Sequence, residues 1–383
     1  MNKSLHIAVI QQSPDIGGAE TFMCSLVTEF LKQGHTVCLA TDSEKYAKLY
    51  KNLKVTINKI PFILDISGNW KGLVKSILRL PIAIAYYSSL LRSYKNNNVH
   101  LILMSGFSEK LLVSFLTLFI KIPVVWIEYG PLAPIIKRNF SLPFVLYTLI
   151  SKIPKRIIVP TENTKKSLLN DIYIAPSKII VIPCGIVLHK KKHNRKKPKY
   201  LKNKIVIGNV SRLTREKGQQ LLINAMPDIL SKNPQVHLLL VGDGPDKEYF
   251  SELIKKLNIS KSVTLTGFVK NTDDYYRQMD IFVFPTIWPL EGFGLVMVEA
   301  MDYGLPIIAH NSGPVPEIVK NNNTGLLVPL DDKNALIYAI LSLVTNQALR
   351  ERLGGAGRRR AVNLFDIEKI SKKYEKVFYE AIS

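Results

Sequence analysis

Short runs rich in β-branched residues alternate with helical patterns along most of the chain, and this alternation constrains the fold more than any other feature. Such runs, separated by helix-length segments, are typical of parallel strands joined by helices. In the first half a helix is expected from Ala19 to Gln33, closed by Gly34. The strands expected there are LHIAVI, TVCLAT, VHLILM, PVVWIE and RIIVPT.

The pattern is interrupted by a basic stretch and then starts again. Residues 186–204 carry nine Lys and Arg and no Asp or Glu, so like-charge repulsion predicts an extended, solvated linker. The strands expected after it are IVIGNV, VHLLLVG, SVTLTGF, IFVFPT, PIIAH and GLLVP. The 383 residues also exceed the roughly 250–300 at which a single core stops growing. We therefore expect an α/β protein with two Rossmann-like, doubly wound parallel-sheet domains, residues 1–185 and 205–365, facing an interdomain cleft where ligands bind.

The net charge of +22 is concentrated in one half of the chain. Residues 1–185 carry 22 Lys and Arg against 10 Asp and Glu, whereas residues 205–383 carry 21 against 20. This asymmetry indicates an anionic partner for the first half, either a phosphate-bearing lipid surface or nucleic acid, although a lysine-rich composition on any solvated face would also explain it. The chain lacks the aromatic-interleaved basic motifs of single-strand binders and any recognisable helix-turn-helix, which argues against nucleic acid.

Cysteine content and hydropathy favour a protein of a reducing compartment. Cys24, Cys38 and Cys184 are too few and too scattered for a disulfide framework or a metal cluster. The first residues lack the apolar run of a signal peptide, so the chain is expected to begin here. The longest apolar stretch, Leu111 to Trp126, is interrupted by a lysine and a proline, and no transmembrane helix is expected.

Three loops that follow expected strands contain residues suited to an anionic ligand. SPDIGGAETF places Gly17 and Gly18 before a helix whose N-terminus can face an anion, although Gly-Gly is also a plain turn. RLTREKG supplies Arg212 and Lys217, a planar fork and a point charge that could neutralise a diphosphate or simply be solvated. VGDGP is expected to be a tight structural turn, and the lack of a GxGxxG pattern argues against nicotinamide binding.

The segment PLEGFGLVMVEAM contains two carboxylates eight residues apart, Glu291 in a loop and Glu299 in a helix that starts near Gly294 and ends near Gly304. This separation is too large for the two groups to share a proton. We interpret them as separate contacts with one elongated ligand, whose phosphates would face the amides of residues 293–295.

These residues also carry a family resemblance. The E-x7-E pattern, preceded by RLTREKG and VGDGP and followed by GLPIIAHNSGPVPEIVKNNNTGLLVP, resembles the retaining glycosyltransferases of family 4, which adopt the GT-B fold. GGAETFMCSLVTEFLKQGHTV is similar to the first loop and helix of that family, and VIPCGI to its domain-junction motif. The resemblance covers most of the chain and thins between residues 40 and 150.

The resemblance implies a nucleotide-sugar donor, a UDP- or GDP-sugar, held mainly by the second domain, with no cofactor and no metal required. Arg212 and Lys217 would bind the diphosphate and stabilise its charge as it leaves, and Glu291 would accept hydrogen bonds from the donor sugar; these three are the expected catalytic residues. Glu299 would bind the ribose. The other donor-binding residues would be Gly18, from the opposite domain, and the amides near Gly294 and Leu295.

Two features of the resemblance concern the first domain. Many relatives have a histidine facing the sugar at the end of the strand that matches PVVWIEYG, where this chain has Glu128 and Tyr129. These two are candidates for contact with the sugar or the acceptor, and a structural strand-end carboxylate is an equal alternative. The final segment, 366–383, is an amphipathic helix pattern. Since the last helix of GT-B folds commonly crosses back, we expect it to pack on the first domain.

The expected function is transfer of a sugar to a cell-envelope glycan or glycolipid, such as lipopolysaccharide, capsule or exopolysaccharide. The enzyme would be cytoplasmic and peripheral on the inner face of the cell membrane, where Trp70–Arg79 could lie on anionic lipid while Leu80–Leu91 forms a core helix. One alternative is a soluble transferase that acts on a small or storage saccharide. A nucleic-acid-binding protein is the alternative from another class.

Overall fold

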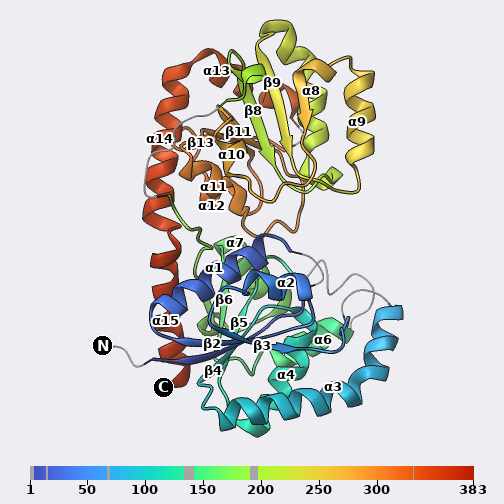
Figure 1. Cartoon of the computed structure of the whole chain (residues 1–383), viewed down its shortest axis with the longest axis vertical. Coiled ribbons are helices and arrows are strands. Elements are labelled where there is room, and N and C mark those ends of the chain that lie inside the picture. The colour runs from blue at the N-terminus through green and yellow to red at the C-terminus, as the bar shows by residue number, and fades with distance from the viewer. Residues whose placement is uncertain (1–3, 14–15, 67–69, 133–141, 190–196, 331) are drawn as a thin grey trace. The chain divides into compact units, whose positions relative to one another are not determined.

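The computed structural model describes residues 4–13, 16–66, 70–132, 142–189, 197–330 and 332–383. It divides into two compact units, one formed by Met1–Gly185 with Ile367–Ser383 and the other by Ile186–Asp366. Each unit is built around one parallel β-sheet with helices on it (Figure 1). The α/β class expected from the alternating pattern is confirmed.

The first unit contains a seven-stranded sheet in the order β3-β2-β1-β4-β5-β6-β7. Two of these strands are absent from the sequence-based prediction. β3 lies at the sheet edge with mostly exposed residues, and β7 is only three residues long, so neither produces a long apolar run. The strands are β1 (His6–Ile10), β2 (Thr36–Thr41), β3 (Val55–Lys59), β4 (Leu101–Met104), β5 (Val124–Ile127), β6 (Arg156–Val159) and β7 (Ile179–Val181).

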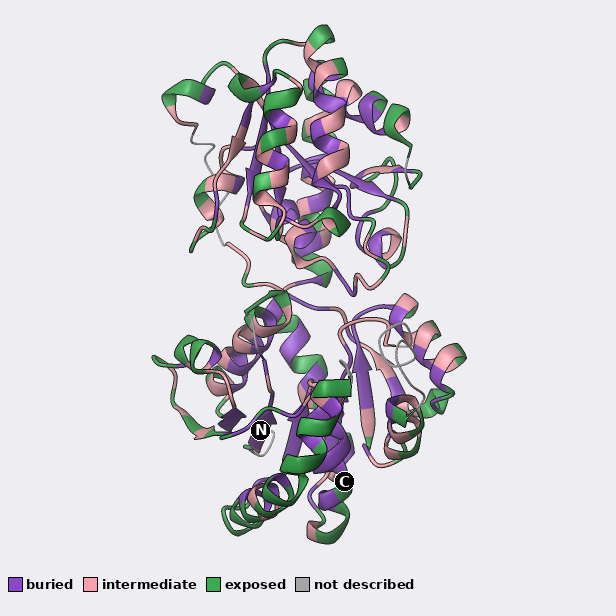
Figure 2. Ribbon diagram, turned by 90° about the vertical axis from the view of Figure 1, so that its right-hand side faces the viewer, coloured by how far each residue is buried: buried purple, intermediate pink, exposed green. Residues whose placement is uncertain are grey.

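Most helices of the first unit bury one face and expose the other, as the purple and green sides of the ribbons show (Figure 2). This is the amphipathic arrangement that a sheet-covering helix requires. By contrast, α4 (Phe107–Ile120) is buried all round from residue 108 to 114. Within the described ranges, no helix is both long and apolar enough to cross a membrane. The helices are α1 (Gly18–Lys32), α2 (Glu44–Leu49), α3 (Trp70–Asn96), α4 (Phe107–Ile120), α6 (Leu142–Ile150), α7 (Glu162–Ile172) and α15 (Ile367–Ile382).

The final helix, α15, is part of the first unit although it follows the whole of the second. It packs along α1, where the rings of Phe30 and Phe378 lie 5.3 Å apart. The Gln33 side-chain amide, just after α1, donates to the Ser371 hydroxyl at 2.7 Å. The buried face of α15 consists of Ile367, Ile370, Ser371, Tyr374, Val377, Phe378 and Ala381.

The second unit contains a six-stranded sheet in the order β10-β9-β8-β11-β12-β13. Its strands are β8 (Ile205–Val210), β9 (Val236–Val241), β10 (Val263–Leu265), β11 (Ile281–Phe284), β12 (Ile307–His310) and β13 (Gly325–Val328). The helices are α8 (Gln219–Lys232), α9 (Lys247–Lys256), α10 (Asp273–Tyr276), α11 (Leu295–Asp302), α12 (Val315–Ile318), α13 (Lys333–Thr345) and α14 (Gln347–Leu364).

The stretch 186–204, expected to be a solvated linker, is described at 186–189 and 197–204 and is counted with the second unit. Ile186 forms a β-bridge with Asp366, and Leu201 is fully buried. The Lys197 ammonium contacts the Asp280 carboxylate at 2.5 Å. Ile186, Lys197 and Leu201 therefore contact the rest of the second unit, whereas Val187, Lys199, Tyr200, Lys202 and Asn203 are exposed. Residues 190–196 lie outside the described residues.

Both sheets reverse their strand order at one point, between β1 and β4 in the first unit and between β8 and β11 in the second. In doubly wound sheets, ligands bind outside the carboxyl ends of the strands at such a point. A ligand site of the second unit is therefore expected at the loops after β8 and β11.

Candidate functional site

The loop after β8 carries Arg212 and is fixed by hydrogen bonds from the next helix. The side-chain amide of Gln219, in the first turn of α8, donates to the carbonyl of Arg212 at 2.8 Å and to the Ser211 hydroxyl at 2.7 Å. The amide of Leu213 donates to the carbonyl of Asp243 at 2.9 Å, which ties this loop to the VGDGP turn after β9. The backbone at Arg212 is consequently held from two sides.

The loops after β8 and β11 touch at Gly218. This residue has a φ of +75°, and a Cβ there would lie 1.9 Å from the carbonyl oxygen of Pro285. The Ile287 amide donates to the carbonyl of Glu216 at 2.9 Å, which is a second connection between the loops. Only glycine allows both the left-handed backbone and the close approach. The two loops at the reversal point therefore form one connected structure.

Lys217 and Glu291 form an ion pair between these loops. The Lys217 ammonium lies 2.8 Å from a Glu291 carboxylate oxygen, and the two side chains are 25% and 14% exposed. The sequence predicted separate ligand contacts for them, and the structure brings them into direct contact. A pair of this kind fixes the position of both groups. The ammonium has further N–H donors and the carboxylate has a second oxygen, and these can bind a polar ligand.

Gly294 and Leu295 mark the start of α11, as expected from the sequence. Gly294 has a φ of +85° and is the N-cap, and the first turn of the helix contains no acidic residue. The amides at the beginning of a helix lack intrahelical acceptors and lie at the positive end of its dipole. This end of α11 follows the Glu291 loop directly and is suited to an anion.

Glu299 lies farther along α11 and is held by a tyrosine that the sequence analysis missed. The Tyr276 hydroxyl donates to the Glu299 carboxylate at 2.7 Å, and the Tyr276 ring stacks on Tyr303 with centroids 5.2 Å apart. Burial raises the pKa of Glu299, and the hydrogen bond from Tyr276 opposes that rise. No sequence motif marks Tyr276, because its role depends on a tertiary contact between α10 and α11.

At the first-unit reversal point, α1 begins at Gly18, as expected from GGAETF. The Glu20 carboxylate occupies the end of this helix and accepts hydrogen bonds from the Gly17 amide at 2.8 Å and the Ser13 hydroxyl at 2.8 Å. It also accepts one from the Gln11 side chain at 3.1 Å. The chain's own carboxylate therefore engages donors at the start of α1. Pro14 and Asp15 of the same motif lie outside the described residues.

Glu128 follows β5 and faces the interior of the first unit. It is 3% exposed, and one of its oxygens accepts from the Lys110 ammonium at 2.5 Å and from the Tyr147 hydroxyl at 2.5 Å. Lys110 is itself buried and also donates to the Ile127 carbonyl at 2.6 Å. This is the arrangement expected of a structural strand-end carboxylate, and it differs from that of a residue facing a ligand.

The Tyr129 side chain also points inward. Its hydroxyl is buried without a hydrogen-bond partner among the described residues, and its ring makes an edge contact with Phe22 of α1. Burial raises the pKa of Tyr129 well above its usual value. The polar atoms of Glu128 and Tyr129 are thus both turned away from solvent, an arrangement that favours the structural alternative for Glu128.

Glu109, in the first turn of α4, is a buried carboxyl that the sequence analysis did not single out. It accepts a hydrogen bond from the Gln12 amide at 2.9 Å and so connects α4 to the loop after β1. Burial raises the pKa of Glu109 to about 7, although the Gln12 amide and Lys110 both favour the charged form. It is therefore a titratable group at the first-unit reversal point.

Two family models match the chain. One, described as Glycosyl transferases group 1, matches residues 190–360, and the other, described as Glycosyltransferase Family 4, matches residues 16–190. The chain belongs to the family 4 glycosyltransferases. The expected family is confirmed.

Several relatives of this glycosyltransferase are similar over part of their length. The capsular polysaccharide biosynthesis glycosyltransferase CapM of Staphylococcus aureus is 31% identical, over 61% of this chain and 65% of CapM. The N-acetyl-α-D-glucosaminyl L-malate synthase of Bacillus anthracis is 30% identical, over 47% of this chain and 46% of that protein. The α-monoglucosyldiacylglycerol synthase of Streptococcus pneumoniae is 26% identical, over 82% of this chain and 72% of that protein. The chain thus spans less than two thirds of CapM and of the malate synthase.

Solved structures resemble the glycosyltransferase over its whole length. A glycosyltransferase from Rickettsia africae has a TM-score of 0.82 at 19% identity, and the match covers 100% of this chain and 100% of that one. Anabaena HepE, in complex with UDP and glucose, has a TM-score of 0.80 at 18% identity, covering 98% of this chain and 100% of HepE. The chain has the GT-B fold, as the sequence indicated.

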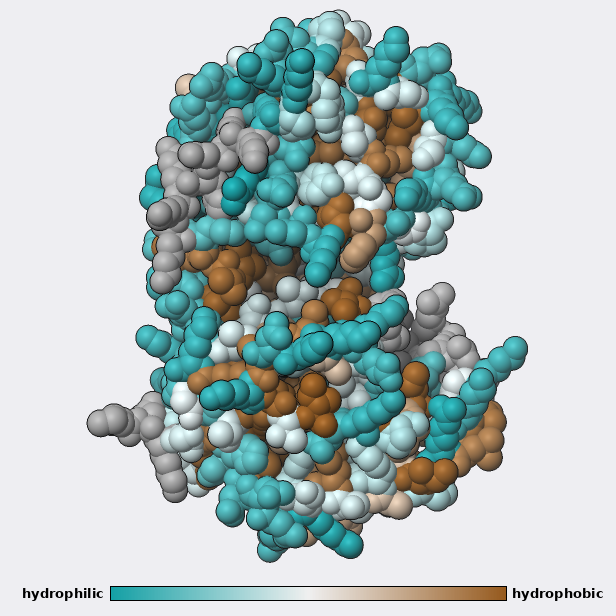
Figure 3. Space-filling view, in the orientation of Figure 1, coloured by the Kyte–Doolittle hydropathy of each residue, from teal (hydrophilic) through white to brown (hydrophobic). Residues whose placement is uncertain are grey.

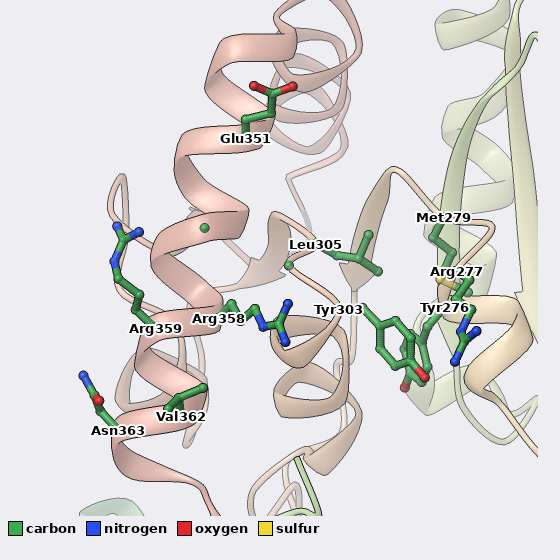
Figure 4. A pocket seen from close by; sticks show the side chains of 12 residues that line it. Tyr276, Arg277, Met279, Tyr303, Leu305, Glu351, Arg358, Arg359, Val362 and Asn363 are labelled. Carbon is green, nitrogen blue, oxygen red and sulfur yellow. The ribbon is translucent and has the colours of Figure 1, made fainter. Parts of the chain in front are cut away.

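The second unit of the glycosyltransferase also contains a cavity of about 1020 Å³ near the amino ends of β11 and β12, opposite the strand ends that carry the candidate site (Figure 4). It lies between α14 and the segments that enter β11 and β12, and none of the residues expected from the sequence to bind the donor lines it. Arg358 points from α14 toward Tyr303 and Arg277 (Figure 4). The cavity is connected to the candidate site through Tyr276, whose ring lines it and whose hydroxyl binds Glu299.

Proposed function

We propose that this protein is a retaining glycosyltransferase that transfers a sugar from a UDP- or GDP-sugar to a cell-envelope glycan or glycolipid at the inner face of the cell membrane. The observation that carries the proposal is the Lys217–Glu291 pair, at the reversal point of a doubly wound sheet and next to the start of α11. A cation, a carboxylate and a helix N-terminus in one place suit a ligand that carries both phosphates and hydroxyls.

In the proposed site, Arg212 and Lys217 bind the diphosphate together with the amides near Gly294. Their positive charge stabilises the negative charge that develops on the leaving diphosphate, which is the main catalytic contribution. Because fixed cations and a helix N-terminus supply this stabilisation, the proposed reaction needs no metal ion. The other contribution to catalysis is positioning: when the enzyme holds the acceptor next to the donor sugar, their reaction becomes effectively intramolecular.

The carboxylates orient the donor. Glu291 accepts hydrogen bonds from the sugar hydroxyls, and its contact with Lys217 at 2.8 Å keeps the sugar next to the phosphate site. Glu299, held by Tyr276 at 2.7 Å, accepts from the ribose hydroxyls. The new bond forms on the face of the sugar that the diphosphate leaves, so that the anomeric configuration is retained.

Relatives support the proposed donor and the proposed class of acceptor. HepE is in complex with UDP and glucose, CapM is named for capsular polysaccharide biosynthesis, and the Streptococcus pneumoniae relative is an α-monoglucosyldiacylglycerol synthase. A nucleotide-sugar donor suits the cationic site of this chain, and the names of CapM and of the synthase support an envelope or lipid acceptor.

A nucleotide-sugar panel tests the proposal. A donor present at 100 times its dissociation constant should stabilise the wild-type protein by about 2.7 kcal/mol, which a thermal melt resolves. Lys217→Ala should lose this stabilisation, and Lys255→Ala, at an exposed position on α9, should keep it. If no UDP- or GDP-sugar shifts the melt of the wild-type protein, or if Lys217→Ala shifts like the wild type, the proposed donor site is wrong.

A further inference from the structure

Three neighbouring helices of the first unit expose an unusual number of large apolar side chains. α3 packs against α4, and α4 packs against α6. On α3, Trp70 is 64% exposed, Leu78 73% and Ile82 63%, and on α4 Phe119 is 71% exposed. The other members are Val74, Ile77, Leu80, Ile84, Phe115, Leu118, Leu142, Val145 and Leu149. These residues together are the α3–α4–α6 surface. Brown side chains gather in Figure 3 where Figure 1 shows α3.

The exposed residues of α3 form a continuous stripe rather than scattered positions. Trp70, Val74, Ile77, Pro81 and Ile84 follow one another at intervals of three or four residues, which places them on one side of the helix. The opposite side is buried in the unit and consists of Leu73, Ser76, Ala83, Tyr87, Leu90, Leu91 and Tyr94. The first half of α3 therefore has two apolar sides, of which only one is covered by the protein.

Cations lie along this stripe and carboxylates do not. Lys71, Lys75 and Arg79 recur at intervals of four beside it, and all three are exposed. The sequences of α3, α4 and α6 contain a single acidic residue, Glu109, which is buried. An apolar stripe flanked by lysine and arginine is the pattern of a helix that lies in the headgroup region of a membrane.

We propose that the α3–α4–α6 surface binds the face of a lipid bilayer that contains anionic lipids. The aromatic and aliphatic side chains enter the boundary between headgroups and acyl chains, and the flanking cations bind lipid phosphates. This inference rests on the proposed function for one point only, namely that the acceptor reaches the enzyme at the membrane. It extends the expected contact from Trp70–Arg79 along α3 to Ile84, a part of the helix that was expected to lie in the core, and further to α4 and α6.

The charges of the surface favour a bilayer over a second copy of the chain. Two copies meeting at this surface would bring like-charged flanks together, because Lys71, Lys75 and Arg79 would face cations of the other copy without any exposed carboxylate from these helices. A bilayer with anionic headgroups supplies the missing negative charge and the apolar layer at the same time.

Sedimentation with vesicles tests the proposal on the full chain. At about 0.15 M salt the wild-type protein should bind vesicles of equal parts phosphatidylglycerol and phosphatidylcholine and bind pure phosphatidylcholine much more weakly. Leu78→Ser combined with Ile82→Ser should weaken binding at least about tenfold, because two exposed apolar side chains are lost. Replacing the three cations by glutamine should weaken it about 10²-fold, since each contributes a factor of about five.

Matched controls come from exposed residues of the second unit. Phe268→Ser with Tyr338→Ser removes two side chains that are 80% and 77% exposed. A triple glutamine variant at exposed lysines removes the same charge as the α3 triple; its positions are Lys255, Lys256 and Lys261. Both control variants should bind vesicles within about twofold of the wild-type protein.

The proposal is overturned if the wild-type protein ignores the anionic vesicles, or if the control variants lose binding as much as the α3 variants. A wild-type dimer that becomes a monomer in Leu78→Ser with Ile82→Ser, measured by sedimentation velocity without vesicles, would identify a second copy as the occupant and would also overturn it. Lys217→Ala should bind vesicles like the wild type. Vesicle binding without any donor binding would therefore refute the proposed function and leave this inference intact.

Discussion

The Lys217–Glu291 pair allows the most informative test of the candidate site. Lys217→Ala, Glu291→Gln and the double variant form a cycle that separates the effect of each residue from the effect of their contact. The side chains are 2.8 Å apart and 25% and 14% exposed, so the pair lies between a solvated surface pair and a buried one. Lys255→Ala on α9 is the matched control for removal of a lysine from the same unit.

The two effects differ in size. At 2.8 Å and an effective dielectric of about 20, the direct attraction is about 6 kcal/mol, most of which is cancelled by the cost of removing both groups from water. We therefore expect Lys217→Ala to lower the free energy of unfolding by only about 1–2 kcal/mol. Turnover should fall by about 10²–10³-fold, the loss typical of one preorganised charge stabiliser.

The assay is initial-rate transfer or donor hydrolysis, with thermal melts of the same protein samples. Glu291→Gln should also lower turnover by about 10²-fold, and the double variant should lose less than the product of the two single losses, since each residue positions the other. A Lys217→Ala protein with wild-type turnover would remove this residue from the mechanism. Losses that multiply in the double variant would show that the two residues act independently.

Three further predictions concern named residues. Burial raises the pKa of Glu109 from 4.5 to about 7, so between these pH values the native state binds a proton that the unfolded state has lost. As the pH rises from 4.5 to 7, the free energy of unfolding of the wild type should therefore fall by about 3 kcal/mol relative to that of Glu109→Gln. Parallel stability profiles of the two proteins would contradict this. Gly218→Ala should lower the free energy of unfolding, measured in denaturant melts, by at least about 2 kcal/mol, because the new Cβ would lie 1.9 Å from the Pro285 carbonyl oxygen. In the control Gly355→Ala, the nearest atom to the new Cβ is 3.7 Å away, and the protein should not be destabilised. Tyr276→Phe removes a hydrogen bond that lowers the pKa of Glu299, so the acidic limb of the pH–rate profile should move to higher pH; an unchanged profile would exclude Glu299 as its origin.

The sequence was sufficient to predict much of the fold because buried parallel strands have continuous apolar sequences. β8 begins and ends at the predicted residues, 205 and 210. β3 was missed because an edge strand with exposed residues has no such run, and β7 because it is too short. Within 186–204 the charge pattern alone could not indicate that Lys197 meets Asp280 or that Leu201 is buried.

The site was predicted as a set of loops but not as a set of contacts. Strand-end positions located Arg212, Lys217 and Glu291 in the loops beside the reversal point, because that rule depends only on strand order. The contact between Lys217 and Glu291 joins residues 74 positions apart and has no signature in either motif. The same reason explains why Tyr276 and Gln219, which hold neighbouring groups, were not identified: their function depends on packing between elements and not on spacing.

The position of α15 has a consequence for how this protein is made. Phe22 and Phe30 precede the second unit in sequence, yet the helix that covers them, Ile367–Ile382, follows it. During synthesis those rings and the adjoining face of α1 stay without their cover until the second unit has emerged from the ribosome. Native completion of the first unit therefore requires prior synthesis of the whole second unit. A message truncated shortly before codon 367 would yield a polypeptide whose apolar α1 face stays exposed to chaperones and proteases.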